Sequence, residues 1–261
     1  VEIAVNGMPH AMAKMPAAPT VSRATGNSPR YELFVGRDLM TAGQFLDFLN
    51  DMNATDDNIG TDADGNMFYE INGTVYRLFD ISEVNDVVEQ GEQIFDYGVV
   101  FDDAADVAYS FAPGFDVHYT YPIFGVSWEG AAMYCNWLSR VKGLIAHDHA
   151  YIIDEEGCRP RHLSQAEWAN GFDEDERREW LARYPFAYRL AMDNYQAGAD
   201  TFNEFYWYAA GPEGATFGSP HGGNWWGSGD FFEPGPNWVG YFGENAMGVT
   251  DASGNAWEWM S

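Results

Sequence analysis

One stretch in the middle of the chain decides the fold prediction, namely Pro122-Ile123-Phe124-Gly125-Val126-Ser127-Trp128-Glu129-Gly130-Ala131-Ala132-Met133-Tyr134-Cys135-Asn136-Trp137-Leu138-Ser139. It begins with a short apolar run, and Ser127 is a residue type that favours the N-cap of a helix. Beyond the cap, an apolar stripe recurs at helical spacing, made of Trp128, Ala131, Cys135 and Leu138. The stretch therefore predicts a strand that runs into a helix over residues 128–139.

Local signals on both sides of this stretch predict further elements. Thr41 can cap a helix over about residues 42–51, because the apolar side chains that follow it fall on one face. Ser164-Gln165-Ala166-Glu167 is a capping box, so short helices are expected from Gln165 to about residue 182. Asn72-Gly73 is a strong two-residue turn signal, and we expect a β-hairpin of residues 67–71 and 74–79 around it.

The remaining segments show no lasting period. Residues 1–30 mix small residues, Pro and Met and indicate an extended N-terminal arm. Residues 80–118 are acidic and irregular, which favours a solvated insertion. After Asn194, aromatic residues and Gly dominate, so we expect long loops anchored by aromatic side chains.

Composition excludes some classes of function. The 261 residues include 40 acidic and 13 basic side chains, for a formal charge of −27, which would repel nucleic acid. Such a surface suits solubility, divalent cations or a high-salt setting. No apolar run is long enough for a membrane span, and the first residues lack a signal-peptide pattern.

Several residues that could suggest a metal or redox site have a simpler interpretation. Cys135 and Cys158 are too few for a disulfide framework and lack zinc-site spacing. Asp62-Ala63-Asp64-Gly65-Asn66 resembles a calcium loop, yet Gly60 and Ile71 occupy its first and twelfth positions, so a turn is favoured. His147 and His149 alternate without further ligands and are expected in an exposed loop.

Four sequence blocks, in this order, resemble the formylglycine-generating enzyme (sulfatase-modifying factor) family. They are Thr41 to Asn50, Gly125 to Leu138, Arg161 to Trp168, and Gly248-Val249-Thr250-Asp251-Ala252-Ser253-Gly254-Asn255-Ala256-Trp257-Glu258-Trp259. The resemblance implies an α+β, C-type-lectin-like fold, irregular, with few helices and short strands. It also implies one domain over residues 31–261, preceded by the arm.

The same resemblance implies calcium sites. In the family the last block holds a calcium ion, and the matching ligands here are the Asp251 and Glu258 side chains and the Gly254 and Ala256 carbonyls. A second ion would take Asn224 and Asp230. Calcium prefers such carboxylate and backbone oxygens. In the alternative interpretation, Asp251 only caps the turn and Glu258 is solvated.

The family's catalytic cysteines, which bind copper, follow its last block, whereas only Met260 and Ser261 follow it here. We therefore expect no catalytic residue and no copper site in this sequence. Cys135 matches a helix cysteine that some members pair with that segment, and it is interpreted here as a small buried hydrophobic residue. Cys158 is expected in an acidic, loop-like insertion over residues 140–158.

Two functions remain open. The first is a non-enzymatic display, structural or ligand-recognition module on a secreted, cell-surface or virion protein, which would be a divergent member of the family. Its partners would be a protein or glycan, or neighbouring subunits, bound through the aromatic-rich loops between residues 202 and 243. The alternative is a cysteine-oxidising formylglycine-generating enzyme, or a related sulfoxide-synthase-type oxidase, whose catalytic segment lies beyond Ser261.

Overall fold

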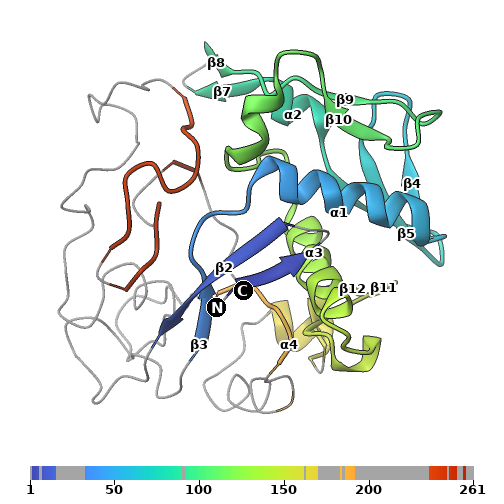
Figure 1. Cartoon of the computed structure of the whole chain (residues 1–261). Helices are drawn as coiled ribbons and strands as arrows, with labels where there is room; N and C mark the ends of the chain where they lie inside the picture. The colour runs from blue at the N-terminus through green and yellow to red at the C-terminus, as the bar shows by residue number, and fades with distance from the viewer. Residues whose placement is uncertain are drawn as a thin grey trace.

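The computed structural model describes a mixed α+β protein built from short elements (Figure 1). The described residues are 2–5, 8–15, 33–89, 92–161, 163–169, 183, 186–191, 235–245, 247–251 and 255–256. They contain four α-helices and twelve strands, and every strand pair is antiparallel. The α+β class is therefore confirmed, whereas the C-type-lectin-like topology stays a prediction.

Helix α1 (Ala42–Thr55) begins at the predicted cap and runs further than expected. The Gln44 amide donates to Thr41 Oγ1 at 3.2 Å, and the Thr41 amide donates to Gln44 Oε1 at 3.0 Å. This reciprocal pair satisfies two amides that a helix start leaves without partners. The helix buries Phe45, Phe48 and Leu49 completely.

Helix α3 (Trp128–Val141) confirms the helix predicted from the central stretch. The prediction of a strand before it was wrong, because Pro122 and Val126 form only isolated bridges, with Thr41 and Phe79. Ser127 Oγ accepts a hydrogen bond from the Gly130 amide at 2.9 Å and donates one to the Arg77 carbonyl at 2.6 Å. Arg77 belongs to strand β6 (Thr74–Phe79), so the cap also ties the helix to a strand. A Cβ atom at Gly130 would lie 2.2 Å from the Leu78 carbonyl oxygen, and only glycine permits this close approach.

The predicted hairpin is present as strands β5 (Met67–Ile71) and β6, and β4 (Ile59–Thr61) extends the sheet beside β5. Asn72 and Gly73 have φ values of 51° and 85°, which is the backbone that a type I′ turn requires. In the loop before β5, Asp62 Oδ1 accepts hydrogen bonds from the Asp64 and Asn66 amides. The Asp62 carboxylate therefore organises a turn, as the sequence indicated.

The prediction of a solvated insertion over residues 80–118 was wrong. This segment forms α2 (Ile81–Asn85), β7 (Val87–Glu89), β8 (Glu92–Phe95), β9 (Val99–Phe101), β10 (Tyr109–Phe111) and a 3-10 helix (Asp116–Thr120). Tyr97 and Tyr109 are fully buried in the main core, and the Tyr97 hydroxyl donates to the Pro122 carbonyl. Acidic turns connect these buried residues, and the high acidic content of the segment made it look solvated in the sequence.

The first strands of the chain form a separate small sheet. β2 (Met8–Met15) pairs with both β1 (Glu2–Val5) and β3 (Leu33–Gly36). Part of the segment expected as an extended arm therefore forms two paired strands. The boundary between arm and domain near residue 30 stays a prediction.

Residues after α3 form a strand pair and a short helix. A 3-10 helix (Ala146–Asp148) leads to β11 (Tyr151–Asp154), which pairs with β12 (Gly157–Pro160), and α4 (Gln165–Ala169) follows. The capping box is confirmed, because the Ser164 amide donates to Glu167 Oε2 at 2.7 Å and the Glu167 amide donates to Ser164 Oγ at 3.2 Å. The helical continuation expected to residue 182 lies outside the described residues.

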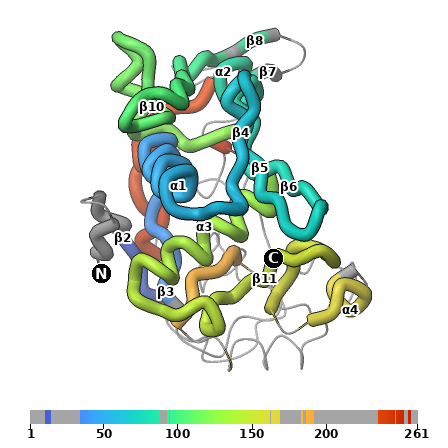
Figure 2. Tube along the Cα trace, turned by 90° about the vertical axis from the view of Figure 1, so that its right-hand side faces the viewer, coloured from blue at the N-terminus to red at the C-terminus, as the bar shows by residue number. Residues whose placement is uncertain are grey.

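Helix α3 lies between two clusters of buried side chains. On one side Tyr134, Trp137 and Leu138 join the main cluster, where Tyr134 stacks against Phe45 of α1. On the other side Ala132 and Cys135 join a smaller cluster with residues of β11 and β12. Figures 1 and 2 both show α3 beside α1, and β6 and β11 also contact α3. None of the helices in the described ranges has both the length and the apolar character that crossing a bilayer requires.

Candidate functional site

The described part of the C-terminal turn places Asp251 in a buried, polar setting. Asp251 has a φ of 55°, and the residue is only 8% exposed. Its Oδ2 accepts hydrogen bonds from the Gly240 amide at 2.6 Å and from Thr250 Oγ1 at 2.9 Å. Its Oδ1 has a contact of 3.5 Å with Asn255 Nδ2, which is long for a hydrogen bond. Oδ2 thus accepts two hydrogen bonds, whereas Oδ1 has only a weak contact and can still accept a hydrogen bond or bind a cation.

A second carboxylate, that of Asp38, lies close to this turn and is paired with the Arg37 guanidinium at 2.9 Å. Thr250 Oγ1 also lies 2.9 Å from Asp38 Oδ1. Burial raises the pKa of Asp251, the charge of Asp38 raises it further, and the hydrogen bonds from Gly240 and Thr250 oppose both effects. A bound cation would offset the cost of the buried charge.

Two of the six predicted metal ligands can be examined. Asp251 fits the role of a hard-cation ligand through its lightly used Oδ1. Ala256 lies one residue after Asn255, whose side chain contacts Asp251, so its carbonyl belongs to the same turn. Gly254, Glu258, Asn224 and Asp230 fall outside the described residues. The hydrogen bonds to Oδ2 also agree with the turn-capping alternative, so both interpretations of Asp251 stand.

The two cysteines are both buried, and their thiols are protonated. Cys135 on α3 and Cys158 on β12 are each 7% exposed, and both lie in the smaller core cluster. Burial raises the pKa of Cys135 to about 12 and also raises that of Cys158. The expectation that Cys158 lies in a loop was wrong, because it pairs with Ile153 across two strands. Neither thiol is a thiolate at neutral pH, and thiolate is the reactive and metal-binding form.

The two histidines do not share one environment. His147 is exposed, as predicted, whereas His149 is buried, and its Nε2 lies 3.4 Å from the Leu144 carbonyl oxygen. Burial lowers the pKa of His149, so its ring is neutral at neutral pH. The prediction of an exposed loop was therefore wrong for His149. Within the described ranges, no three His, Cys, Asp or Glu side chains group closely enough to hold a metal ion.

The sequence of the chain matches a known protein family. A family model described as "Sulfatase-modifying factor enzyme 1-like domain" matches residues 30–261. The chain belongs to this family. The match covers all four sequence blocks, and so the resemblance found in the sequence is confirmed for the sulfatase-modifying factor family as a whole. No curated protein and no solved structure matches the chain.

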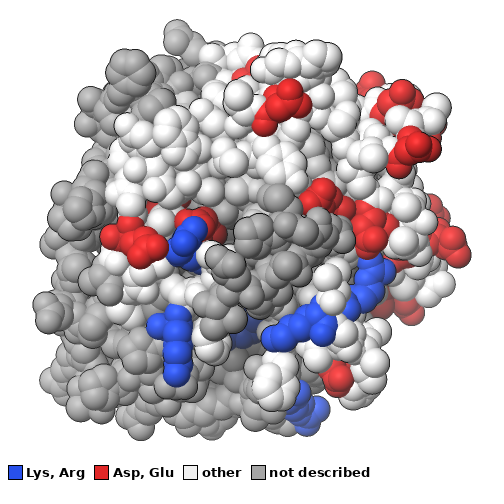
Figure 3. All heavy atoms as spheres, in the orientation of Figure 1, with Lys and Arg blue, Asp and Glu red and all other residues white. Residues whose placement is uncertain are grey.

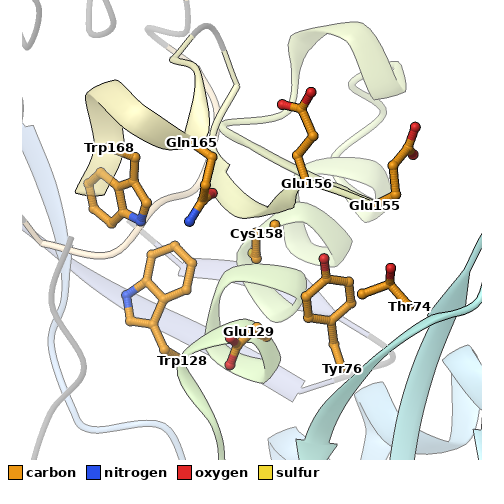
Figure 4. A pocket seen from close by; sticks show the side chains of 10 residues that line it. Thr74, Tyr76, Trp128, Glu129, Glu155, Glu156, Cys158, Gln165 and Trp168 are labelled. Atoms are coloured by element: carbon orange, nitrogen blue, oxygen red, sulfur yellow. The ribbon is translucent and has the colours of Figure 1, made fainter. Parts of the chain in front are cut away.

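This member of the sulfatase-modifying factor family also has a pocket that the sequence did not predict. It has a volume of about 580 Å³ and lies between β6, the first turn of α3, the β11–β12 turn and α4. Figure 4 shows Trp128 and Trp168 on one side of the pocket, Tyr76 on the other, and Cys158 between them. The sequence assigned Trp128 to a buried helix stripe, yet this side chain is only half-buried. Four elements form the pocket, so no local pattern could predict it.

Proposed function

We propose that this chain is a non-enzymatic recognition module, in which a sulfatase-modifying factor scaffold presents a binding surface to a protein or glycan partner or to a neighbouring subunit. The observation that carries the proposal is the state of the two thiols. Cys135 and Cys158 are buried, protonated and enclosed by apolar neighbours. A copper(I) site that oxidises a substrate cysteine would need soft thiolate ligands within reach of the substrate.

Recognition is supported by surface features of the described residues. The pocket described above combines aromatic faces with carboxylates. A second aromatic group lies in the loop of residues 235–245, where Trp238 and Tyr241 are 40% and 44% exposed and their ring centroids are 4.8 Å apart. Exposed aromatic side chains on a rigid scaffold supply contact area at low entropic cost. The setting proposed for such a module is an extracellular, cell-surface or virion protein.

Calcium is proposed as a stabilising ion at the C-terminal turn. The support is the buried Asp251 carboxylate, whose pKa is raised by burial and by the charge of Asp38. An ion there would bind the Asp251 carboxylate and turn carbonyls such as that of Ala256. In this role the ion would fix loop structure and take no part in a reaction.

The alternative is an oxidase of the same family, and the enzyme named in the family's description is the observation that favours it. Such an enzyme would need reactive cysteines other than Cys135 and Cys158. The test is to incubate the purified chain with copper, oxygen and a cysteine-containing sulfatase peptide, and to measure formylglycine by mass. We expect no product. Turnover that disappears in Cys135→Ala or Cys158→Ala would overturn the proposal.

The same variants provide a direct test of the thiol environment. We expect a thiol reagent to label neither cysteine in the folded chain at neutral pH and to label both after denaturation, because burial keeps both thiols protonated. The single variants show which cysteine reacts. Rapid labelling of either residue in the folded state would remove the observation on which the proposal rests.

A further inference from the structure

We propose that the pocket between β6, α3, β12 and α4 binds an alkylated ammonium cation. This inference rests on the proposed recognition function and deepens it by naming the class of ligand. The pocket is lined by aromatic rings, carboxylates and an uncharged floor. Each of these three features favours an organic cation over the other ligands that such a pocket could take.

The aromatic wall is the first feature. The rings of Trp128 and Trp168 have centroids 5.6 Å apart and an interplanar angle of 34°. The buried Tyr151 ring packs edge-on against Trp128 at 5.6 Å, which holds that indole in place. Opposite them, the Tyr76 hydroxyl donates to the Asp154 carbonyl at 2.6 Å and so fixes its ring. The faces of Trp and Tyr rings attract cations, and alkylated ammonium groups are well suited to them because their methyl groups also bury apolar surface.

The charge of the lining is the second feature. Three carboxylates line the pocket, from Glu129, Glu155 and Glu156, and no Lys or Arg is among the lining residues. The nearby Arg159 guanidinium is bound to both Asp154 oxygens at 2.7 and 2.9 Å and reaches Glu156 Oε2 at 3.4 Å. Arg159 is therefore already neutralised by Asp154. The pocket keeps an excess of negative charge that a cationic ligand would balance.

Glu129 is the carboxylate best placed to meet such a ligand. It lies half-buried in the first turn of α3, beside Trp128, and lines the pocket. Its side chain makes no hydrogen bond or ion pair with any residue that the structure describes. Glu155, in contrast, accepts a hydrogen bond from Asn72 at 3.2 Å. Glu129 thus remains available for a charge that arrives from outside.

The arrangement of the carboxylates argues against a metal ion. In the described part of the chain no three acidic, His or Cys side chains converge closely enough to hold one, whereas the three glutamates surround a space of about 580 Å³. The floor is formed by Cys158, whose raised pKa keeps the thiol neutral. A space of this size, with charge at its edge and apolar groups inside, suits an organic ligand.

Gln165 completes the lining because of a glycine. Gly157 has a φ of 151°, and a Cβ atom there would lie 2.4 Å from Gln165 Oε1. The absent side chain lets the Gln165 amide approach β12 and face the pocket (Figure 4). Its amide adds a neutral polar group to the acidic lining.

The test uses the whole chain and a matched pair of probes. Choline is titrated into the protein by calorimetry and by tryptophan fluorescence, next to its tert-butyl isostere, in which carbon replaces the charged nitrogen. We expect saturable choline binding, with the isostere at least about tenfold weaker, because the isostere keeps the shape and loses the charge. Equal binding of the two probes, or binding of a neutral monosaccharide without choline, would overturn the proposal.

Two variants and one control assign the site. Glu129→Gln and Trp168→Leu should each weaken choline binding severalfold, whereas Glu70→Gln removes an exposed carboxylate on β5 outside the pocket and should not. Circular dichroism verifies that each variant is folded, and Glu129→Gln decides the question if Trp168→Leu is not. Unchanged affinity in folded Glu129→Gln would overturn the assignment.

A peptide with a trimethylated lysine side chain distinguishes the source of the ammonium group. Tighter binding of the peptide than of choline would identify a protein partner, and tighter binding of choline would identify a free or lipid-derived ligand. Both results support the ammonium site. The proposed function is tested separately, since formylglycine production would contradict the non-enzymatic role without affecting the choline result.

Discussion

At Asp251, burial and backbone conformation act together on a single carboxylate. The residue has a positive φ, which non-glycine residues seldom adopt, and its charge lies away from water beside Asp38. Both features cost free energy in the folded state. They persist because the surrounding turn holds the residue in place, and a bound cation would turn the electrostatic cost into a gain.

The first prediction concerns calcium and this carboxylate. Saturating calcium, about 100 times its dissociation constant, should stabilise the wild-type chain by about 2.7 kcal/mol relative to chelator, because the ion binds only the folded state. Asp251→Asn should lose most of this gain and should be no less stable than the wild type in chelator. Thermal melts with calcium and with chelator measure both effects. Equal wild-type melting temperatures in the two buffers would contradict the prediction.

The second prediction concerns the pair of Asp154 and Arg159. Hydrogen bonds from the buried Arg159 lower the pKa of Asp154 below 3.8. An aspartate with a depressed pKa contributes stability above its unfolded-state pKa of 3.8 and loses it as the pH falls through the folded-state pKa. Asp154→Asn should therefore cost about 1–3 kcal/mol near neutral pH, and this difference should shrink below pH 3.8.

Urea unfolding of the two proteins as a function of pH tests the Asp154 prediction. The control is Asp103→Asn, which changes an exposed aspartate in a turn. A difference between wild type and Asp154→Asn that stays constant in acid would show that the ion pair does not supply the stability.

Single residues also show where sequence reasoning succeeds and fails. Cys135 was predicted to be buried, and it is, because its helix stripe is a local pattern. Cys158 was predicted in a loop, because three acidic residues precede it, yet these residues form only the turn of a buried strand pair. His149 was expected in an exposed loop because it alternates with His147 without further ligands, yet it is buried. Burial of both residues depends on neighbours brought from elsewhere in the chain, which a local reading does not include.

Among the elements, the contact between α3 and β6 depends on Gly130. The third prediction is that Gly130→Ala destabilises the chain by about 1–3 kcal/mol, the usual cost of overpacking, although alanine favours a helix. The reason is that the new methyl group would lie 2.2 Å from the Leu78 carbonyl oxygen, which belongs to backbone and cannot rotate away. Chemical denaturation measures the change.

A matched control separates the clash from the general effect of removing a glycine. Gly60 on β4 has no heavy atom within 4 Å of the position that a Cβ would take. Gly60→Ala should therefore change stability by no more than about 0.5 kcal/mol, as is usual for surface substitutions. A Gly130→Ala protein as stable as Gly60→Ala would show that the helix and strand separate without cost.

The elements that could be predicted are those with local signals. Thr41, Ser127 and Ser164 each mark a helix start through a side chain that accepts from an amide three residues away, and Asn72-Gly73 marks a turn. The strands between residues 87 and 111 have no such signal, because each is only three or four residues long, which is too short to show an alternating pattern. Their hydrophobic residues show no period, since they enter one core from different directions.

The whole molecule carries a formal charge of −27. On the face shown in Figure 3, carboxylates gather over the side where α1, β4 and β5 lie. The fourth prediction is that sodium chloride stabilises the fold, because counterions screen the repulsion among surface carboxylates. Raising the salt from about 0.01 M to about 0.5 M, with chelator present, should increase the melting temperature by about 2–4 °C.

The chelator in this experiment excludes specific calcium binding, so the salt effect reports general screening. A neutral osmolyte at equal osmolality serves as the control for changes in water activity. A melting temperature that falls with salt would show that attractive pairs, such as Arg140 with Asp51, outweigh the repulsion.

The position of α3 between the two core clusters has a consequence for folding cooperativity. Its Tyr134 face belongs to the main cluster, and its Cys135 face belongs to the cluster with β11 and β12. Local unfolding of either cluster would displace α3 and so remove packing contacts from the other cluster. We therefore expect the two clusters to unfold as one cooperative unit. The amide hydrogens of α3 then exchange with solvent only when both clusters open together, and damage on one side of the helix weakens protection on the other.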